Sequence, residues 1–294
     1  MIKDTDLAYM AGYIDGDGCF FIRKSATKFL AHIIIASTDK NVLSYFKNHL
    51  GGSIASSKKI PKQKQVFYYT LGKVRSNQLT KEILPYLVER IDEATIFLAF
   101  IKSQKNSERI DLISKMKTCR ESTNLVTRDL KEIYEATRGT IQPSKDDFAY
   151  LAGFIDAECC FTITRERRKD GLYCVYKAIL TCNNSKAPNF KWLLERFNGR
   201  INFIDRNSKD PNLRDQFKWH ISAKRLRNVI DKIHPFLKHK KPVCEEIMKF
   251  NNTVIPNGGD RQSQAYKASY ASIIKERECI VHNVHFLNLK GTSI

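Results

Sequence analysis

The sequence predicts an α+β protein of two similar halves, each with the order helix, strand, strand, helix, strand, strand, helix. A 17-residue stretch occurs twice, as DLAYMAGYIDGDGCFFI at residues 6–22 and as DFAYLAGFIDAECCFTI at residues 147–163, and ten of its positions are identical. Apolar segments and turn residues follow each copy in the same order. A chain of 294 residues is also long enough for two domains, each with its own core.

Each copy of the repeat begins as a helix with small residues along one side. Asp6 is the N-cap candidate of the first copy, and Ser144 or Asp146 is that of the second. Small residues recur at every fourth position: Ala8, Gly12 and Gly16, and Ala149, Gly153 and Ala157. Glycine costs a helix about 1 kcal/mol relative to alanine, so we expect the two stripes to pack together with close backbone contact. That packing would place Asp17 beside Glu158. The alternative is a duplicated core helix whose terminal acids face solvent.

Turn residues and alternating apolar positions locate the other elements. In the first half we expect helices at residues 7–17, 41–50, 77–84 and 91–101, and strands at 19–24, 29–36, 54–57 and 66–72. In the second half we expect strands at 161–165, 173–181, 200–205 and 216–222, and helices at 190–197, 223–233 and 243–250. These elements divide the chain into a first domain (1–105), a charged linker with helical segments (106–145), a second domain (146–250) and a C-terminal extension (251–294) with a candidate helix at 262–278.

The centre of each repeat carries a recognisable motif. MAGYIDGDG (residues 10–18) and LAGFIDAEC (residues 151–159) resemble the signature of the LAGLIDADG homing endonucleases, in the single-chain form with two motifs. The resemblance covers residues 5–250. It implies two pseudo-symmetric αββαββα domains with four-stranded antiparallel DNA-binding sheets, and a monomer that cuts both strands of a long asymmetric DNA site. Cys159 stands where the family has glycine, and Glu158 replaces aspartate but keeps the carboxylate.

The charge balance agrees with a nucleic-acid partner. Lysine and arginine number 50 against 31 aspartates and glutamates, which gives a net charge of +19. Such an excess favours a polyanion, and double-stranded DNA is the expected partner. An anionic membrane is the rival, but the sequence has no apolar run of 18 residues and no strongly amphipathic cationic helix, so we expect no membrane partner.

Cysteine usage and the N-terminal residues bear on location. The eight cysteines include no CxxC pair, so we expect reduced thiols and neither a zinc site nor a disulfide framework. The first residues lack the charged, apolar and small-residue order of a signal peptide. We therefore expect the protein inside the cell. Its Lys-, Asn- and Ile-rich composition suggests an AT-rich genome, in a mitochondrion, a chloroplast or a bacterial cytoplasm.

Phosphodiester hydrolysis needs a metal-activated water and cations around the developing charge, and carboxylates are suitable ligands for Mg²⁺. By the resemblance, the metal ligands are the side chains of Asp17 and Glu158 and the main-chain carbonyls of Gly16 and Ala157. The cofactor is Mg²⁺ or another divalent cation such as Mn²⁺, with Ca²⁺ supporting no cleavage. Asp15 and Asp156, two residues before the ligands, are expected to cap or support the site.

The resemblance also implies a basic residue near each metal. PYLVER and PFLKHK place Arg90 and Lys240 five residues after a proline, at the position of the family's pocket lysine, and both are candidate catalytic residues. Plain surface charge is the alternative for each. Ser37 and Asn183, just past the second strand of each half, are candidates for polar residues that order water.

Polar and basic residues at alternate strand positions predict that one face of each sheet contacts the major groove, where Arg and Lys read guanine and Asn and Gln read adenine. The candidate DNA-binding residues are Arg23, Lys28, Lys64 and Gln65 in the first half, and Arg165, Arg167, Arg206, Arg214 and Lys218 in the second. For each of them, phosphate contact or a solvated surface is the alternative.

Other functions remain open at this level. An RNA maturase on the same scaffold would assist intron splicing with intron RNA as its partner, and a DNA-binding regulator would keep the fold without cleavage. Regulators of that kind lose one or both motif acids, whereas both acids are present here. The HNVH string at residues 282–285 lacks the further ligands of a histidine nuclease, and Val284 stands where an intein would need a splice nucleophile. The favoured function is a site-specific, Mg²⁺-dependent double-strand DNA endonuclease.

Overall fold

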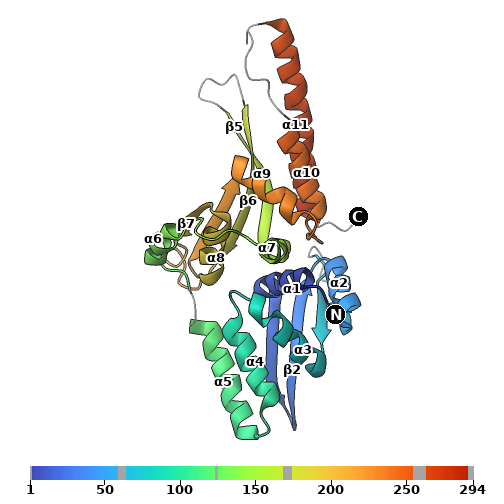
Figure 1. The fold of residues 1–294 in the computed structure, drawn as a ribbon, viewed down its shortest axis with the longest axis vertical. Coiled ribbons are helices and arrows are strands. Elements are labelled where there is room, and N and C mark those ends of the chain that lie inside the picture. Colours follow the sequence, from blue (N-terminus) through green and yellow to red (C-terminus); the bar gives the residue numbers. More distant parts are fainter. Residues whose placement is uncertain (1, 59–63, 123–124, 168–173, 254–262, 291–294) are drawn as a thin grey trace.

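The computed structural model describes residues 2–58, 64–122, 125–167, 174–253 and 263–290. It has two similar halves, each with a four-stranded antiparallel sheet and helices against that sheet. The halves meet at helices α1 (Asp4–Asp17) and α7 (Lys145–Glu158), which lie side by side between the two sheets (Figure 1). The expected α+β class and the duplicated architecture are confirmed.

The first half follows the predicted order of elements. After α1 come β1 (Gly18–Ser25), β2 (Lys28–Ser37), α2 (Lys40–Leu50), β3 (Ser53–Ser56), β4 (Phe67–Leu71), α3 (Lys73–Ile83), the short 3-10 helix η1 (Leu84–Tyr86) and α4 (Ile91–Lys102). The strand order in the sheet is β1-β2-β4-β3, with every neighbouring pair antiparallel. Gly51, with a φ of 71°, ends α2 as expected.

The second half repeats this topology. After α7 come β5 (Cys159–Arg167), β6 (Cys174–Asn184), α8 (Pro188–Phe197), β7 (Arg200–Ile204), β8 (Gln216–Ser222), α9 (Ala223–Ile233) and α10 (Lys241–Asn252). The strand order is β5-β6-β8-β7, the counterpart of the first sheet. β6 runs three residues beyond its predicted end at 181, because residues up to 184 pair with β8.

The linker and the C-terminal extension are helical. The linker holds α5 (Asn106–Ser122) and α6 (Arg128–Ala136). The extension holds α11 (Gln264–Lys290), which runs well past the predicted end at residue 278. Ile280 and Val284 are buried in this later part, and α11 packs against α10 and β5 (Figure 1). No helix among the described residues has both the length and the apolar character needed to cross a bilayer.

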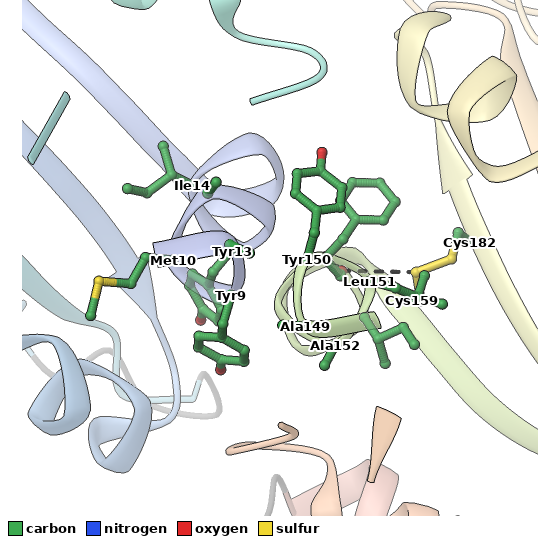
Figure 2. Close-up of a cluster of buried hydrophobic side chains, with 14 of the residues drawn as sticks. Tyr9, Met10, Tyr13, Ile14, Ala149, Tyr150, Leu151, Ala152, Cys159 and Cys182 are labelled. Atoms are coloured by element: carbon green, nitrogen blue, oxygen red, sulfur yellow. Dashed lines mark hydrogen bonds between the residues drawn. A yellow bond between two sulfur atoms is a disulfide. The ribbon is translucent and has the colours of Figure 1, made fainter. Parts of the chain in front are cut away.

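The stripes of small residues form the contact between α1 and α7. A Cβ atom added to Gly12 would lie 2.0 Å from the carbonyl oxygen of Tyr150, and one added to Gly153 would lie 2.0 Å from the carbonyl oxygen of Tyr9. Only glycine allows the two backbones to come this close. The predicted stripe-to-stripe packing is therefore confirmed, and Figure 2 shows the two helices in contact, with Tyr9 and Tyr150 on either side.

One cysteine pair differs from the prediction that the thiols are reduced. Cys159 and Cys182 form a disulfide (Figure 2). They lie directly opposite each other on β5 and β6, and both are buried. Side chains opposite each other on antiparallel strands have neighbouring Cβ atoms. The sequence spacing of 23 residues gives no sign of this register, which is why the prediction was wrong for this pair.

Candidate active site and nucleic-acid interface

Asp15 and Asp156 anchor the segments that begin α4 and α10. The buried Asp15 carboxylate accepts the backbone N–H groups of residues 88–90 at 2.7, 3.1 and 2.9 Å. Asp156 accepts those of residues 238–240 at 2.7, 3.0 and 2.7 Å. Each carboxylate thus satisfies donors at a helix start. This geometry agrees with the predicted capping role.

That capping places one cation at the C-terminal end of each motif helix. Lys240 Nζ donates to the carbonyl oxygens of Ile155 and Asp156 at 2.6 and 3.0 Å. Arg90 Nε donates to those of residues 14 and 15 at 3.0 and 3.2 Å, and its Nη2 donates to that of Gly16 at 3.3 Å. Cations are favoured at helix C-termini, where carbonyl groups lack intrahelical partners. The structure therefore places both predicted basic residues at the ends of α7 and α1.

Asp17 and Glu158 end the two helices close to each other. A Cβ atom on Gly16 would lie 2.9 Å from Cγ of Glu158. Desolvation by the surrounding protein raises the pKa of the Asp17 carboxyl, which is still exposed in part, to about 6. The positive charges of Lys240 and Arg90 oppose this shift. Burial and the charge of Asp17 raise the pKa of Glu158 to about 7. Two neighbouring carboxyl groups that resist ionisation together are suited to a cation between them.

The oxygen donors at this point fit a hard divalent metal ion. Asp17 and Glu158 offer carboxylates, and Gly16 and Ala157 offer carbonyl groups. The Gly16 carbonyl already accepts a hydrogen bond from Arg90, which leaves one lone pair for a metal. Within the described residues, no group of three or more His, Cys, Asp or Glu side chains is arranged to hold a metal. A hard ion here would complete its shell with waters and substrate phosphate oxygens.

An open pocket of about 280 Å³ lies beside Asp17, and we call it the Asp17 pocket. Its walls include Ser37, Ala157, His239 and Lys240. Ser37 Oγ accepts hydrogen bonds from Tyr13 Oη at 3.3 Å and from the backbone N–H of Asp39 at 3.1 Å.

Ser37 is the last residue of β2 and Asn183 lies inside β6, so neither residue lies past its strand as predicted, and the two are not counterparts. Ser37 pairs with Phe67 in the first sheet, whereas Phe217, the counterpart of Phe67, pairs with Asn184. Asn184 also repeats the local contact of Ser37, because its Oδ1 accepts the backbone N–H of the residue two positions on at 3.0 Å. The six extra residues in the second hairpin shift the numbering, which obscured the correct match.

The open face of each sheet is the face turned away from its helices. In β1 and β2 the buried residues alternate, so Arg23 and Lys28 fall on the open face with Phe21. Lys64 is exposed before β4. Gln65 has a local role, since its Nε2 donates to the carbonyl oxygen of Ser57 at 2.8 Å and holds the end of β3 to the start of β4.

In the second half, Lys218 lies on the open face of β8, but Arg165 does not lie on that of β5. Arg165 shares the helix-covered face with the buried Tyr176, stacks on its ring and pairs with Glu278 of α11 at 3.4 Å. This corrects the prediction, because strand alternation and α11 turn Arg165 away from the expected DNA side. The side chain of Arg167 lies outside the described residues. Arg206 and Arg214 lie in the segment between β7 and β8.

Residues 10–91 match the profile of the LAGLIDADG endonucleases. The resemblance to the LAGLIDADG family that the sequence predicts is confirmed over the first motif and most of the first half. The fold is similar, over both halves, to solved structures of meganucleases. I-AabMI bound to uncleaved DNA has a TM-score of 0.63 and 21% identity, over 92% of this chain and 98% of that one. I-SmaMI bound to an uncleaved DNA target in the presence of calcium ions has a TM-score of 0.63 and 16% identity, over 96% and 98%. I-CpaMI bound to uncleaved DNA has a TM-score of 0.63 and 14% identity, over 95% and 97%. No curated protein sequence matches the chain.

The structure adds residues to the open face of the second sheet that were not predicted from the sequence. Lys177, Arg200 and His220 lie on the second sheet beside Lys218. Partial burial lowers the pKa of His220, and the positive charges of its three neighbours lower it further. Alternation along β6, β7 and β8 was the signal that could have identified them.

Two further residues near Asp17 and Glu158 were not predicted from the sequence. His239 lies in the wall of the Asp17 pocket, and its Nδ1 is hydrogen-bonded to Asp39 of the first half. Glu89, its counterpart in the first half, accepts a hydrogen bond from Asn189 of the second half at 2.7 Å. Burial raises the pKa of Glu89 to about 8. The only sequence signal was that each residue directly precedes a predicted pocket cation, Lys240 or Arg90.

Proposed function

We propose that this protein is a site-specific double-strand DNA endonuclease that hydrolyses phosphodiester bonds in a long asymmetric target with a divalent metal ion. The observation that carries the proposal is the pairing of Asp17 and Glu158 at adjacent helix ends, each beside a cation held by a motif helix. Each half thus has one motif carboxylate with a cation beside it, and each such pair is suited to cutting one DNA strand. A single chain with both pairs acts as a monomer.

The residues at the two helix ends have different chemical roles. Asp17 and Glu158, with the carbonyl groups of Gly16 and Ala157, would hold Mg²⁺ or Mn²⁺. Such an ion, when bound, polarises a phosphate oxygen and lowers the pKa of a bound water. Lys240 and Arg90 provide positive charge where negative charge develops on the phosphate oxygens. Ca²⁺ is expected to support DNA binding without cleavage.

The open faces of the two sheets support the DNA part of the proposal. A twisted antiparallel sheet face fits the major groove, and here the two sheets lie on either side of the α1–α7 pair (Figure 1). The net charge of +19 provides the cations for phosphate contacts. The faces carry different side chains, which suits a target with two unlike half-sites. The solved meganuclease structures of similar fold are bound to DNA, which supports a DNA partner.

The experiment that tests the proposal measures DNA cleavage directly. The protein is incubated with Mg²⁺ and a library of random DNA duplexes, and the cleaved ends are sequenced to obtain the target. Asp17→Asn and Glu158→Gln should each abolish double-strand cleavage of that target and leave its affinity, measured in Ca²⁺, near the wild-type value. Asp111→Asn, an exposed carboxylate on α5, is the control and should cleave normally.

Full cleavage by either pocket variant would overturn the site assignment. Absence of any cleaved end from the wild-type protein would overturn the endonuclease proposal. Tight DNA binding without cleavage would then point to a regulator, and stimulation of intron splicing would point to a maturase.

A further inference from the structure

The Asp17 pocket contains a histidine–carboxylate pair built from both halves. His239 belongs to the segment before α10, and Asp39 is the N-cap residue of α2. Nδ1 of His239 is bonded to Oδ2 of Asp39, and the two residues are 200 positions apart in the sequence. A histidine that donates through Nδ1 to a carboxylate presents its other ring nitrogen, Nε2, as a proton acceptor.

Both members of the pair are held firmly. Asp39 is 2% exposed, and its Oδ1 accepts the backbone N–H of Asn41 at 2.8 Å, at the N-terminus of α2, where negative charge is favoured. The backbone N–H of His239 donates to Asp156 at 3.0 Å, so the main chain of the histidine is fixed as well. The His239 side chain remains 16% exposed and lines the pocket that also contains Asp17 and Lys240.

The equivalent positions of the other half have the opposite polarity. The strand register aligns Ser37 with Asn184, so Asp39 corresponds to Lys186, and His239 corresponds to Glu89. The Asp17 pocket has the base His239 oriented by the acid Asp39. On the Glu158 side the corresponding residues are the carboxyl of Glu89 and the nearby Lys186, whose positive charge opposes the raised pKa of Glu89. Helix packing alone does not explain why the side chains differ. In both halves the backbone N–H at this position donates to the motif aspartate, from Glu89 to Asp15 and from His239 to Asp156.

We propose that His239, oriented by Asp39, is the general base for the attacking water in the Asp17 pocket, and that the described residues on the Glu158 side provide no such base. The proposal rests on the endonuclease function. The water oxygen forms a bond to phosphorus while its proton passes to Nε2 of His239. The bond from phosphorus to the leaving sugar oxygen breaks, and that oxygen takes a proton from solvent. His239 then releases its proton to solvent, so the step consumes one water and no other reactant.

The test is a strand-resolved single-turnover assay on the target found by library cleavage, with the two strands labelled differently. His239→Gln can still donate to Asp39 but cannot take a proton. It should slow the cleavage of one strand by on the order of 10²–10⁴-fold and leave the other strand within about 3-fold of wild type. Asp39→Asn keeps a good N-cap and should slow the same strand to a smaller extent. Glu89→Gln is the matched control and should not slow that strand.

Two further measurements separate a chemical role from a structural one. Imidazole added to His239→Gly should restore cleavage of the slowed strand alone, because a small base can enter the space left by the side chain. DNA affinity in Ca²⁺ and the thermal unfolding midpoint should stay near wild type for His239→Gln. Equal slowing of both strands, no slowing, or no rescue by imidazole would overturn the inference while wild-type cleavage preserves the endonuclease function. If the wild-type protein cleaves no duplex, both proposals fail.

Discussion

The phenol of Tyr150, on the motif helix of the second half, donates a 2.6 Å hydrogen bond to the Asp15 carboxylate on that of the first. Tyr9 makes the reciprocal bond to Asp156 at 2.8 Å. Because the two aspartates also hold the segments at residues 88–90 and 238–240, each pocket cation is tied through one carboxylate to the motif helix of the other half. The two candidate active sites are therefore connected by buried polar contacts as well as by helix packing.

These bonds can be tested by removing one hydroxyl at a time. Tyr150 Oη also lies 3.0 Å from Asn189 Oδ1, which can accept its proton, so Tyr150→Phe disturbs two buried partners, whereas Tyr9→Phe disturbs Asp156. We expect Tyr150→Phe to lower the free energy of unfolding by about 1–3 kcal/mol and Tyr9→Phe to fall at the lower end of that range. Urea denaturation measures both. Tyr68→Phe, on the open face, is the control. Unchanged stability of Tyr150→Phe would show that these bonds contribute little.

The two pocket cations should contribute unequally to cleavage. Arg90 Nη1 is paired with Glu93 at 2.9 Å, which offsets part of its charge, whereas Lys240 Nζ is bonded to two carbonyl groups. Loss of one charge-stabilising donor costs on the order of 10²–10³ in rate. Lys240→Met should therefore slow one strand by about this factor and accumulate nicked DNA, while Arg90→Met slows the other strand less. The strand-resolved assay decides, and equal slowing of both strands by Lys240→Met would contradict the assignment.

Glu89 makes stability depend on pH in a defined direction. Its pKa in the folded protein is about 8, raised by burial from the ordinary value of 4.5. The stability that its proton provides is fully present below about pH 4.5 and is lost as the pH rises to about 8 and above. Glu89→Gln keeps an acceptor for Asn189 without the charge. Its unfolding midpoint relative to wild type should rise by on the order of a few °C between pH 5 and pH 9.

Glu108→Gln, an exposed carboxylate on α5, provides the comparison for that measurement. Its midpoint relative to wild type should be the same at both pH values. A Glu89→Gln variant that behaves like this control would show that Glu89 does not hold a proton in the folded protein.

The salt dependence of DNA binding should locate the basic face. Lys177, Arg200 and Lys218 gather on the open face of the second sheet. Each phosphate contact contributes about −0.9 to the slope of log affinity against log salt. Arg200→Gln and Lys218→Gln should each reduce the magnitude of the slope by up to about that amount in fluorescence-anisotropy titrations. Arg165→Gln, on the helix-covered face, is the matched control and should leave it unchanged. A reduced slope for Arg165→Gln alone would reverse the assignment of faces.

The repeat at residues 6–22 and 147–163 was sufficient to predict the fold and the centre of the candidate site. Helices and strands of this kind are set by periodic apolar positions, caps and turn residues, which are properties of neighbours a few residues apart. Two stripes of glycine and alanine have a clear physical use only in close helix packing, so the contact between α1 and α7 followed from local sequence as well. The same packing fixed the expected position of Asp17 beside Glu158.

The tertiary structure alone decided which distant side chains meet and which face of a strand they occupy. The Cys159–Cys182 disulfide and the Asn184 counterpart of Ser37 depend on strand register, and a shift of one residue moves every side chain to the opposite face. The bond between His239 and Asp39 joins the two halves across the α1–α7 contact. Such pairs are set by long-range packing, to which the spacing of residues along the chain gives no guide.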